Sequence, residues 1–288
     1  MNRLTILATL ISTSILGSGA LFAQEVNVEQ PGYDNSVVVN QQSENVVSVL
    51  QEGSLSQATV QQYGFSNAIS ISQGYESVES FAEVSQIGDN NSVNVLQNTQ
   101  NSYTLVYQSG SSSEVNVNQD LGEQNTVYVD QSSINSTVDV NSFNSSSNNI
   151  EVIQTGEQNG LILSATDGAD SNSIFVEQSG FYNSISLETS GLNNAAFIEQ
   201  SGFQNSIYGA TLGDNNSLTV QQYGDNNTID YVQESSDSNL EVYQNSSNAY
   251  LFANQSGFNN GLVVNQNVAS NISVTQMGAG NQANITID

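Results

Sequence analysis

The sequence repeats about every 11 residues, and this repeat constrains the fold more than any other feature. Three segments show it plainly: Gln178–Asn183, Gln200–Asn205 and Gln255–Asn260 all read Gln-Ser-Gly-Phe-x-Asn. With the glutamine as anchor, units fall at positions 30, 41, 51, 62, 73, 86, 97, 108, 119, 131, 142, 154, 166, 178, 189, 200, 211, 222, 233, 244, 255, 266 and 276. Four anchors are small polar residues instead, namely Ser142, Thr166, Thr189 and Thr211. A short fixed period indicates that equivalent units stack on one another.

The residues two and four places before each anchor are apolar almost throughout, as Ile174 and Val176 are before Gln178. Alternation with a period of two, with β-branched residues on one side, predicts a half-buried strand. The Gly-x-x-Asn segment that follows predicts a turn, because glycine and asparagine tolerate a left-handed backbone. Each unit therefore predicts one strand followed by one turn.

Helix and disorder are the competing interpretations of this composition. A helix requires apolar spacings of three and four, whereas the spacing here is two, and glycine recurs in more than half of the units. High net charge with many Asn, Gln and Ser residues is typical of disorder. The regular apolar pairs argue against disorder, and the single proline, Pro31, falls in the first turn, outside the strands.

We expect an all-β fold, a β-solenoid built from strand–turn–strand–turn rungs. Two units give about 22 residues per rung and about 11–12 rungs. The expected core contains Ile174, Val176, Ile185, Leu187, Leu218, Val220, Leu240, Val242, Leu262 and Val264. Amides carry both donors and acceptors, so like amides are expected to stack in ladders. The expected ladder residues are Gln178, Gln200, Gln222, Gln233, Gln244, Gln255, Gln266, Asn183, Asn194, Asn205, Asn216 and Asn227.

Charge and composition exclude several functional classes. The chain has 28 acidic residues and one basic residue, so a phosphate backbone is a poor partner and we expect no nucleic-acid binding. It has no Cys and no His, which excludes disulfides, zinc fingers and a Cys or His nucleophile–base pair. We expect no catalytic residues, no metal site and no cofactor.

The one basic residue, Arg3, begins a segment typical of a secretory signal peptide. An apolar stretch follows it, and small residues then surround two candidate cleavage sites, after Ala20 or after Ala23. We expect residues 1–23 to be a signal peptide and residues 24–288 to be the repeat solenoid. The apolar stretch is too short to span a bilayer, so we expect no membrane insertion.

Segment Asn172–Asn183, with Gln178, Gly180 and Asn183 in place, resembles the curlin repeat, Ser-x5-Gln-x-Gly-x-Gly-Asn. The second glycine of that pattern is replaced here by residues such as Asp89, Asp214 and Tyr182. The resemblance covers nearly the whole chain after the leader. It implies a secreted subunit of curli-type amyloid fibres, with roles in biofilm matrix and adhesion. It also implies a fimbrial location at the cell surface, a second curlin-like subunit as nucleator or major partner, and an outer-membrane export pore.

The two ends of such a stack expose unpaired backbone groups, which soluble proteins normally cover. The first strand contains Val26 and Val28 and the last contains Ile285 and Ile287, and we expect no capping segment beyond either. These four residues are the expected polymerisation edges, where copies of the chain add end to end to form a homopolymer.

Other functions remain open as alternatives. The chain could be a monomeric acidic solenoid that acts as an adhesin or as a surface protein binding ice, calcium or another ligand. The Gly-Asp-Asn-Asn segments at 88–91, 213–216 and 224–227 suggest calcium, but turn chemistry alone explains them. Within the family, the chain could be the minor nucleating subunit.

Overall fold

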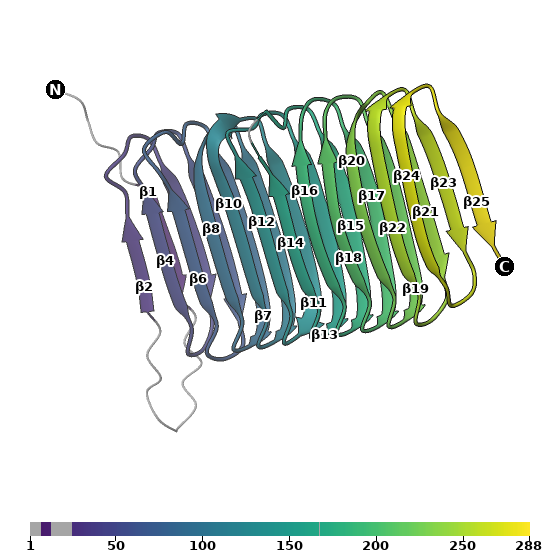
Figure 1. Ribbon diagram of the computed structural model, residues 1–288. Coiled ribbons are helices and arrows are strands. Elements are labelled where there is room, and N and C mark those ends of the chain that lie inside the picture. The colour runs from purple at the N-terminus through teal and green to yellow at the C-terminus, as the bar shows by residue number, and fades with distance from the viewer. Residues whose placement is uncertain (1–6, 13–24, 167) are drawn as a thin grey trace.

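The computed structural model describes residues 7–12, 25–166 and 168–288, and this part of the chain is all β (Figure 1). The strands form two parallel sheets, which we call the odd sheet and the even sheet after their strand numbers. The odd sheet has 13 strands: β1 (Leu7–Ser12), β3 (Ser36–Gln41), β5 (Gln57–Tyr63), β7 (Phe81–Asp89), β9 (Tyr103–Ser111), β11 (Thr126–Ile134), β13 (Asn149–Glu157), β15 (Ser173–Phe181), β17 (Ala195–Phe203), β19 (Ser217–Asp225), β21 (Asn239–Asn245), β23 (Gly261–Gln266) and β25 (Gln282–Ile287). The even sheet has 12 strands: β2 (Glu25–Glu29), β4 (Val46–Gln51), β6 (Ala68–Gln73), β8 (Ser92–Gln100), β10 (Glu114–Glu123), β12 (Thr137–Phe143), β14 (Gly160–Ala165), β16 (Ser184–Ser190), β18 (Ser206–Leu212), β20 (Thr228–Ser236), β22 (Tyr250–Phe258) and β24 (Asn271–Ala279).

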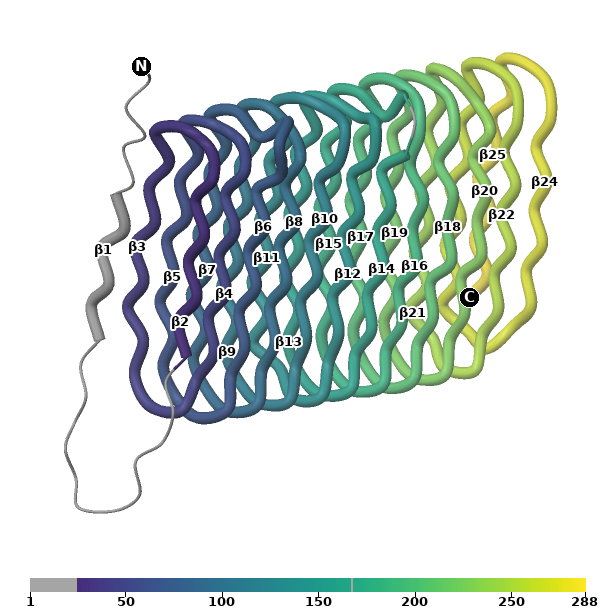
Figure 2. The backbone as a smooth tube through the Cα atoms, turned by 90° about the vertical axis from the view of Figure 1, so that its left-hand side faces the viewer, coloured from purple at the N-terminus to yellow at the C-terminus, as the bar shows by residue number. Residues whose placement is uncertain are grey.

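The chain crosses from one sheet to the other after every strand, so consecutive strands face each other and alternate strands pair (Figure 2). Pairing is parallel and brings like residues together, as Gln178 beside Gln200 shows. From β2 onward each rung takes one strand from each sheet, and rungs in the regular part repeat every 22 residues. The predicted fold class, a β-solenoid of two-unit rungs, is confirmed.

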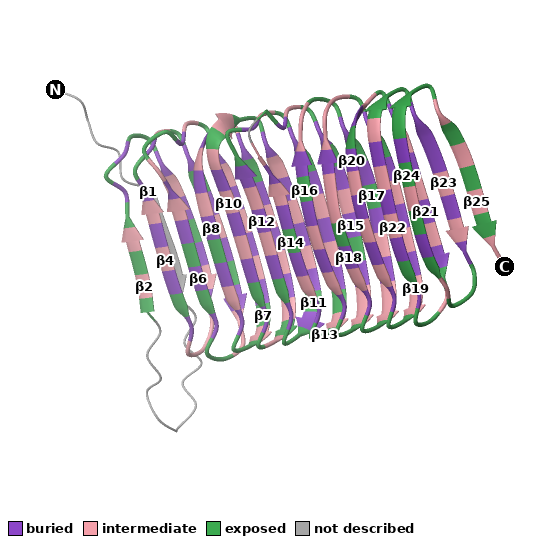
Figure 3. Cartoon of the chain, viewed as in Figure 1, coloured by how far each residue is buried: buried purple, intermediate pink, exposed green. Residues whose placement is uncertain are grey.

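The core is the thin layer between the sheets. Along each strand, buried and more exposed residues alternate, and the buried ones form continuous stripes across the rungs (Figure 3). The structure places Ile174, Val176, Ile185, Leu187, Leu218, Val220, Leu240, Val242, Leu262 and Val264 in this layer, each at most 4 % exposed. Burying each such side chain contributes about 1.5–3 kcal/mol, which a single unit could not gain alone. Stacking is therefore the source of the core.

One unit lies one residue away from its predicted position. Ala165, not Thr166, pairs with Thr189 in the anchor column of the even sheet. Leu161 and Leu163 consequently point into the core. The irregular spacing of the units before residue 178 hides this slip, and a shift by one residue exchanges the two faces of a strand.

The turns differ from the prediction in one respect. Glycine two residues after the anchor is left-handed in most units, as expected, with φ of 100° at Gly180. The second left-handed residue is the one before the asparagine, for example Tyr182 with φ of 58°. Asn183 is not left-handed, so the expectation that this asparagine supplies the left-handed corner is wrong. Asn183 instead serves hydrogen bonding, because its buried amide donates to the backbone of the next rung.

No helix in the described residues is long and apolar enough to cross a membrane.

Candidate functional site

Ten glutamines in the odd sheet form an unbroken amide ladder. The Nε2 atom of each donates to Oε1 of the next at 2.7–2.9 Å. The ladder contains Gln62, Gln86, Gln108, Gln131, Gln154, Gln178, Gln200, Gln222, Gln244 and Gln266. Many of these Nε2 atoms also donate across the core, as Gln178 does to the Gly160 carbonyl at 3.2 Å. Each interior amide therefore connects two rungs and both sheets.

The even sheet carries the same ladder in two sections. One section runs from Gln30 to Gln119 and the other from Gln233 through Gln255 to Gln276. Four residues that cannot form such a ladder separate them: Ser142, Ala165, Thr189 and Thr211. In both sheets every ladder bond runs the same way, from an amide nitrogen to the amide oxygen of the next rung toward the C-terminus.

A glycine–tyrosine pair lies beside this interruption. Gly209 and Tyr231 are neighbours in the even sheet at a position that is apolar elsewhere. A Cβ atom on Gly209 would lie 1.9 Å from Cε1 of Tyr231, so the ring fills the space that a side chain would occupy. Burial raises the pKa of Tyr231, and the side chain of Thr211 partly offsets this effect. The repeat pattern did not predict this pair, although Gly209 at an apolar position was a visible signal.

The asparagines connect the turns mainly through the backbone of the next rung, and Asn281, whose Nδ2 donates to Oδ1 of Asn260 at 3.1 Å, adds an amide-to-amide bond. Nδ2 of Asn183 donates to the Gly202 carbonyl at 2.9 Å, and its Oδ1 accepts the backbone N–H of Asn205 at 2.9 Å. The same pattern places Asn194, Asn205, Asn216 and Asn227 against the backbone of the following rung. The expected stacking of asparagine on asparagine is thus replaced by bonds from each amide to the next turn's backbone.

Both ends of the stack leave apolar core positions partly uncovered. Val26 and Val28 at one end, and Ile285 at the other, are only half-buried, whereas the equivalent residues of interior rungs are buried. Ile287 is also half-buried, but it pairs with Gln266 and so lies in the glutamine column of the odd sheet. Strands β24 and β25 form the C-terminal edges of the two sheets, and β2 forms the N-terminal edge of the even sheet. Among the strands that the structure describes, none pairs with the outer side of these edges.

The N-terminal edge of the odd sheet is covered, which the sequence did not predict. Strand β1 pairs in parallel with β3, from Leu7 beside Ser36 to Ser12 beside Gln41. It lies within residues 1–23, the expected signal peptide, whose candidate cleavage sites after Ala20 and Ala23 lie outside the described residues. The expectation of an uncapped N-terminal end concerns residues 24–288, which lack this segment, and it stays a prediction.

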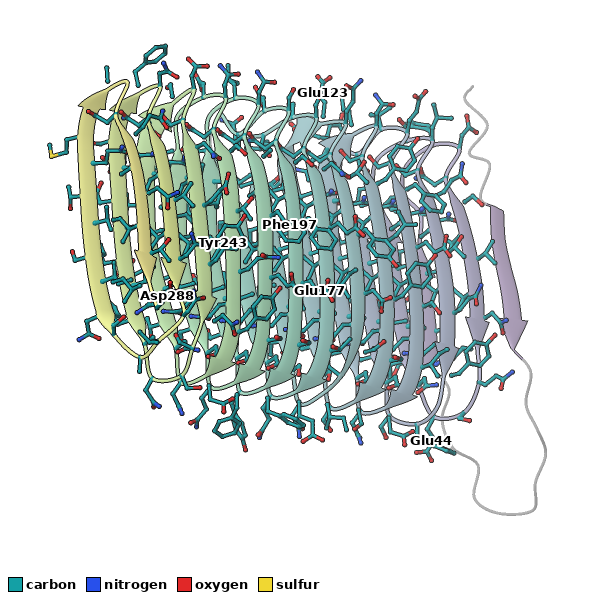
Figure 4. The ribbon with its side chains drawn as sticks, turned by 90° about the vertical axis from the view of Figure 1, so that its right-hand side faces the viewer. Glu44, Glu123, Glu177, Phe197, Tyr243 and Asp288 are labelled. Carbon is teal, nitrogen blue, oxygen red and sulfur yellow. The ribbon has the colours of Figure 1, made fainter. Side chains whose placement is uncertain are left out.

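The outer face of the odd sheet combines carboxylates with aromatic rings (Figure 4). Glu177 and Glu199 are neighbours on this face, and Phe175 stacks on Phe197 with ring centroids 5.3 Å apart. Burial, and then the hydrogen bond and charge of Glu199, raise the pKa of Tyr223. The rings thus contact one another or a carboxylate across rungs.

Turn acids also have backbone partners. Asp89 accepts the N–H of Phe65 at 2.9 Å, and Asp214 accepts that of Leu192 at 2.8 Å. Within residues 7–12, 25–166 and 168–288 no three acidic side chains gather in a way that could hold a metal ion.

Comparison with known families gives one match. Residues 169–202 and 191–224 match the model of the curlin associated repeat. The two matched segments are offset by 22 residues, the length of one rung, and together span β15 to β19. No curated protein matches the chain.

Proposed function

We propose that the chain is a member of the curlin-repeat family, whose repeat model matches residues 169–224, and that it is a secreted structural subunit of curli-type extracellular fibres. On this proposal it contributes to biofilm matrix and adhesion and lies in a fimbrium at the cell surface. Both the family and the solenoid fold are structural, and we propose no enzymatic activity.

The observation that carries this proposal is the incomplete burial of apolar side chains at the two ends of the stack. Val26 and Val28 in β2, and Ile285 and Ile287 in β25, leave apolar surface uncovered beside strand edges. A parallel stack whose last rung resembles its first accepts another copy by the same pairing that joins its own rungs. Copies would then add end to end, with each new joint covering both edges.

The remaining partners of the proposed subunit are inferred from the family resemblance. They are a second curlin-like subunit, acting as nucleator or major subunit, and an outer-membrane export pore. A seeding assay decides between the two subunit roles: traces of a nucleator shorten the lag of its partner, whereas traces of a major subunit leave an unseeded partner's lag unchanged.

Incubation of purified residues 24–288 tests the proposal. We expect unbranched fibres by electron microscopy and cross-β reflections at ~4.8 Å and ~10 Å. A chain that stays a soluble monomer at high concentration, with no such reflections, contradicts the proposal. That result would favour the monomeric acidic adhesin.

A further inference from the structure

The glutamine ladder of the even sheet begins with an unused acceptor. Gln30 is only 8 % exposed, and its Nε2 donates to Oε1 of Gln51. Its own Oε1 is buried and has no hydrogen-bond partner among the described residues. A buried amide oxygen without a donor costs about 1–3 kcal/mol, so a donor placed over Gln30 would be stabilising.

The same ladder ends with an unused donor. Gln276 is 7 % exposed, accepts from Gln255 and donates to the Gly261 carbonyl at 3.2 Å. An amide nitrogen carries two N–H groups, and interior ladder glutamines use the second to reach the next rung. In the described part of the chain, β24, which carries Gln276, is the last strand of the even sheet. The two ends of the ladder are therefore chemically complementary, with a donor at one end and an acceptor at the other.

The strand order would also bring the donor end of one copy next to the acceptor end of another. The last two strands are β24 in the even sheet and β25 in the odd sheet, so the next strand in the alternation belongs to the even sheet. In a second copy lacking residues 1–23, β2 is that strand and β3 follows in the odd sheet. Continuing the existing registers places Gln276 beside Gln30, and Ile285 beside Val39.

Strand β1 shows that the odd-sheet edge accepts an added strand. It pairs in parallel along Ser36–Gln41, the whole of β3. Strand β25 has the same length of 6 residues and would take the same place in a joint between copies. The leader strand and β25 of another copy thus compete for one edge.

We propose that copies join with one polarity and one register: β24 docks on β2 and β25 on β3, with Nε2 of Gln276 donating to Oε1 of Gln30. The leader strand β1 occupies the β3 edge and must leave before the joint closes. This inference rests on the proposed function, because it specifies the joint of the proposed fibre.

Cysteine trapping tests the register, and the chain is suited to it because it has no cysteine. Asn27 and Ser273 both point outward and would be direct neighbours across the joint. Neighbouring strands lie ~4.8 Å apart, within the Cα separation of about 4.4–6.8 Å that a disulfide spans. We therefore mix residues 24–288 carrying Asn27→Cys with the same chain carrying Ser273→Cys, and allow fibres to grow before oxidation.

We expect the mixture to yield disulfide-linked dimers. The matched control replaces Ser273→Cys by Thr275→Cys, which is also exposed but lies two residues along the strand. That shift widens the separation to ~8 Å, so little dimer should form. Equal cross-linking in the control, or linking of Ser273→Cys chains to one another, overturns the register or the polarity. Absence of fibres contradicts the proposed function, whereas fibres without the Asn27–Ser273 link contradict only this joint.

Elongation rates test the two other parts of the proposal. Adding Gln276→Ala chains should leave growing ends that extend at least about tenfold more slowly, whereas Gln61→Ala, an exposed glutamine, should change the rate less than about twofold. Chains retaining residues 1–23 should add to seeds at least about tenfold more slowly than residues 24–288. Thr9→Pro in the retained leader removes a ladder donor from β1 and should restore much of the rate. Equal rates with and without the leader overturn its role as competitor.

Discussion

Gly202 shows how strongly a single residue is constrained by stacking. It is left-handed with φ of 119°, and a Cβ atom there would lie 1.9 Å from the Gly224 carbonyl oxygen. A Cβ atom on turn glycines such as Gly180 and Gly224 would likewise clash with a backbone carbonyl oxygen of the next rung. Glycine is therefore required by the close approach of backbones as well as by its dihedral angle.

Replacing this residue tests the distinction. We expect Gly202→Ala to lower the free energy of unfolding by at least about 3 kcal/mol, because the clash with backbone adds to the left-handed strain. Gly280→Ala is the control, since Gly280 has φ of 71° but open space around its Cβ position, and should cost only about 1–2 kcal/mol. Guanidinium denaturation followed by circular dichroism measures both. Similar losses in the two variants would show that the dihedral angle alone matters.

A second residue-scale prediction concerns the odd ladder. Gln222 accepts from Gln200 and donates to Gln244, each at 2.8 Å. Gln222→Ala leaves one N–H of Gln200 and the Oε1 atom of Gln244 without a ladder partner, and should lower stability by about 1–3 kcal/mol. Gln61→Ala, at an exposed position, should stay within about 0.5 kcal/mol in the same denaturation assay. A ladder variant as stable as the exposed one would show that the ladder contributes little.

For single residues, the sequence predicted which side chains lie above one another better than it predicted which hydrogen bonds and backbone angles they adopt. The columns of Gln222 and Asn183 follow from the repeat, because equivalent residues in a stack must lie above one another. The repeat does not say which turn residue is left-handed, since Asn, Asp, Gln, Ser and Tyr all occupy that position. Only the backbone shows that it precedes Asn183, whose amide bonds the next rung.

Among the strands, the contact between β18 and β20 departs most from the repeat. The ring of Tyr231 fills the space beside Gly209 that a side chain at position 209 would occupy. The large ring therefore requires glycine as its neighbour on the adjacent strand. We expect Gly209→Ala alone to destabilise through its clash with the ring, and Tyr231→Ala alone to cost about 3–5 kcal/mol through the cavity. In the Tyr231→Ala background, Gly209→Ala should instead stabilise by filling space. A double-mutant cycle of unfolding free energies measures this reversal, and additive effects would contradict it.

The same tyrosine predicts sensitivity to high pH. Burial raises the pKa of Tyr231 above its ordinary value of 10.0, so the folded state favours the neutral phenol. The stabilisation is complete below pH ~10 and is lost as pH rises toward the folded pKa, because the unfolded chain ionises first. Tyr231→Phe should therefore reduce the fall in denaturation midpoint between about pH 8 and pH 11. An unchanged fall would assign the effect to other tyrosines.

Strand identity was predictable because the period-two pattern recurs in every unit, whereas the register of β14 was not. Ala165 and Thr166 are both small, so either could be the anchor. Leu161 and Leu163 are apolar, and so is Ile162 between them. The pattern therefore permits either face to point inward. Pairing with Ser142 and Thr189 in three dimensions decides the register.

For the whole molecule, charge opposes assembly. The chain has a formal net charge of -27 and a pI near 4.1, so each added copy approaches an end of like charge. We expect fibre growth to accelerate with added salt or divalent cations, and at a pH near 4, because screening and protonation both weaken the repulsion. Elongation on preformed seeds measures this. Slower growth at pH 4 than at pH 7 in matched low-salt buffer would contradict the repulsion argument.

The number of rungs was predictable from chain length divided by period, because nearly every residue after the leader belongs to a repeat unit. Strand β1 was not, because residues 1–23 match the pattern of a secretory leader and lack the anchor and turn residues of a unit. Only the backbone pairing of the structure shows that this strand lies beside β3.

The even rise of the rungs has a further consequence for how ions surround a fibre. Twelve rungs at ~4.8 Å carry all 28 acidic residues, which corresponds to about one negative charge per 2 Å of axis. Double-stranded DNA carries one per ~1.7 Å, enough to hold a condensed layer of counterions. The proposed fibre would therefore be a polyelectrolyte of nearly the same linear charge density. It should concentrate divalent cations and polyamines along its length without a single coordination site.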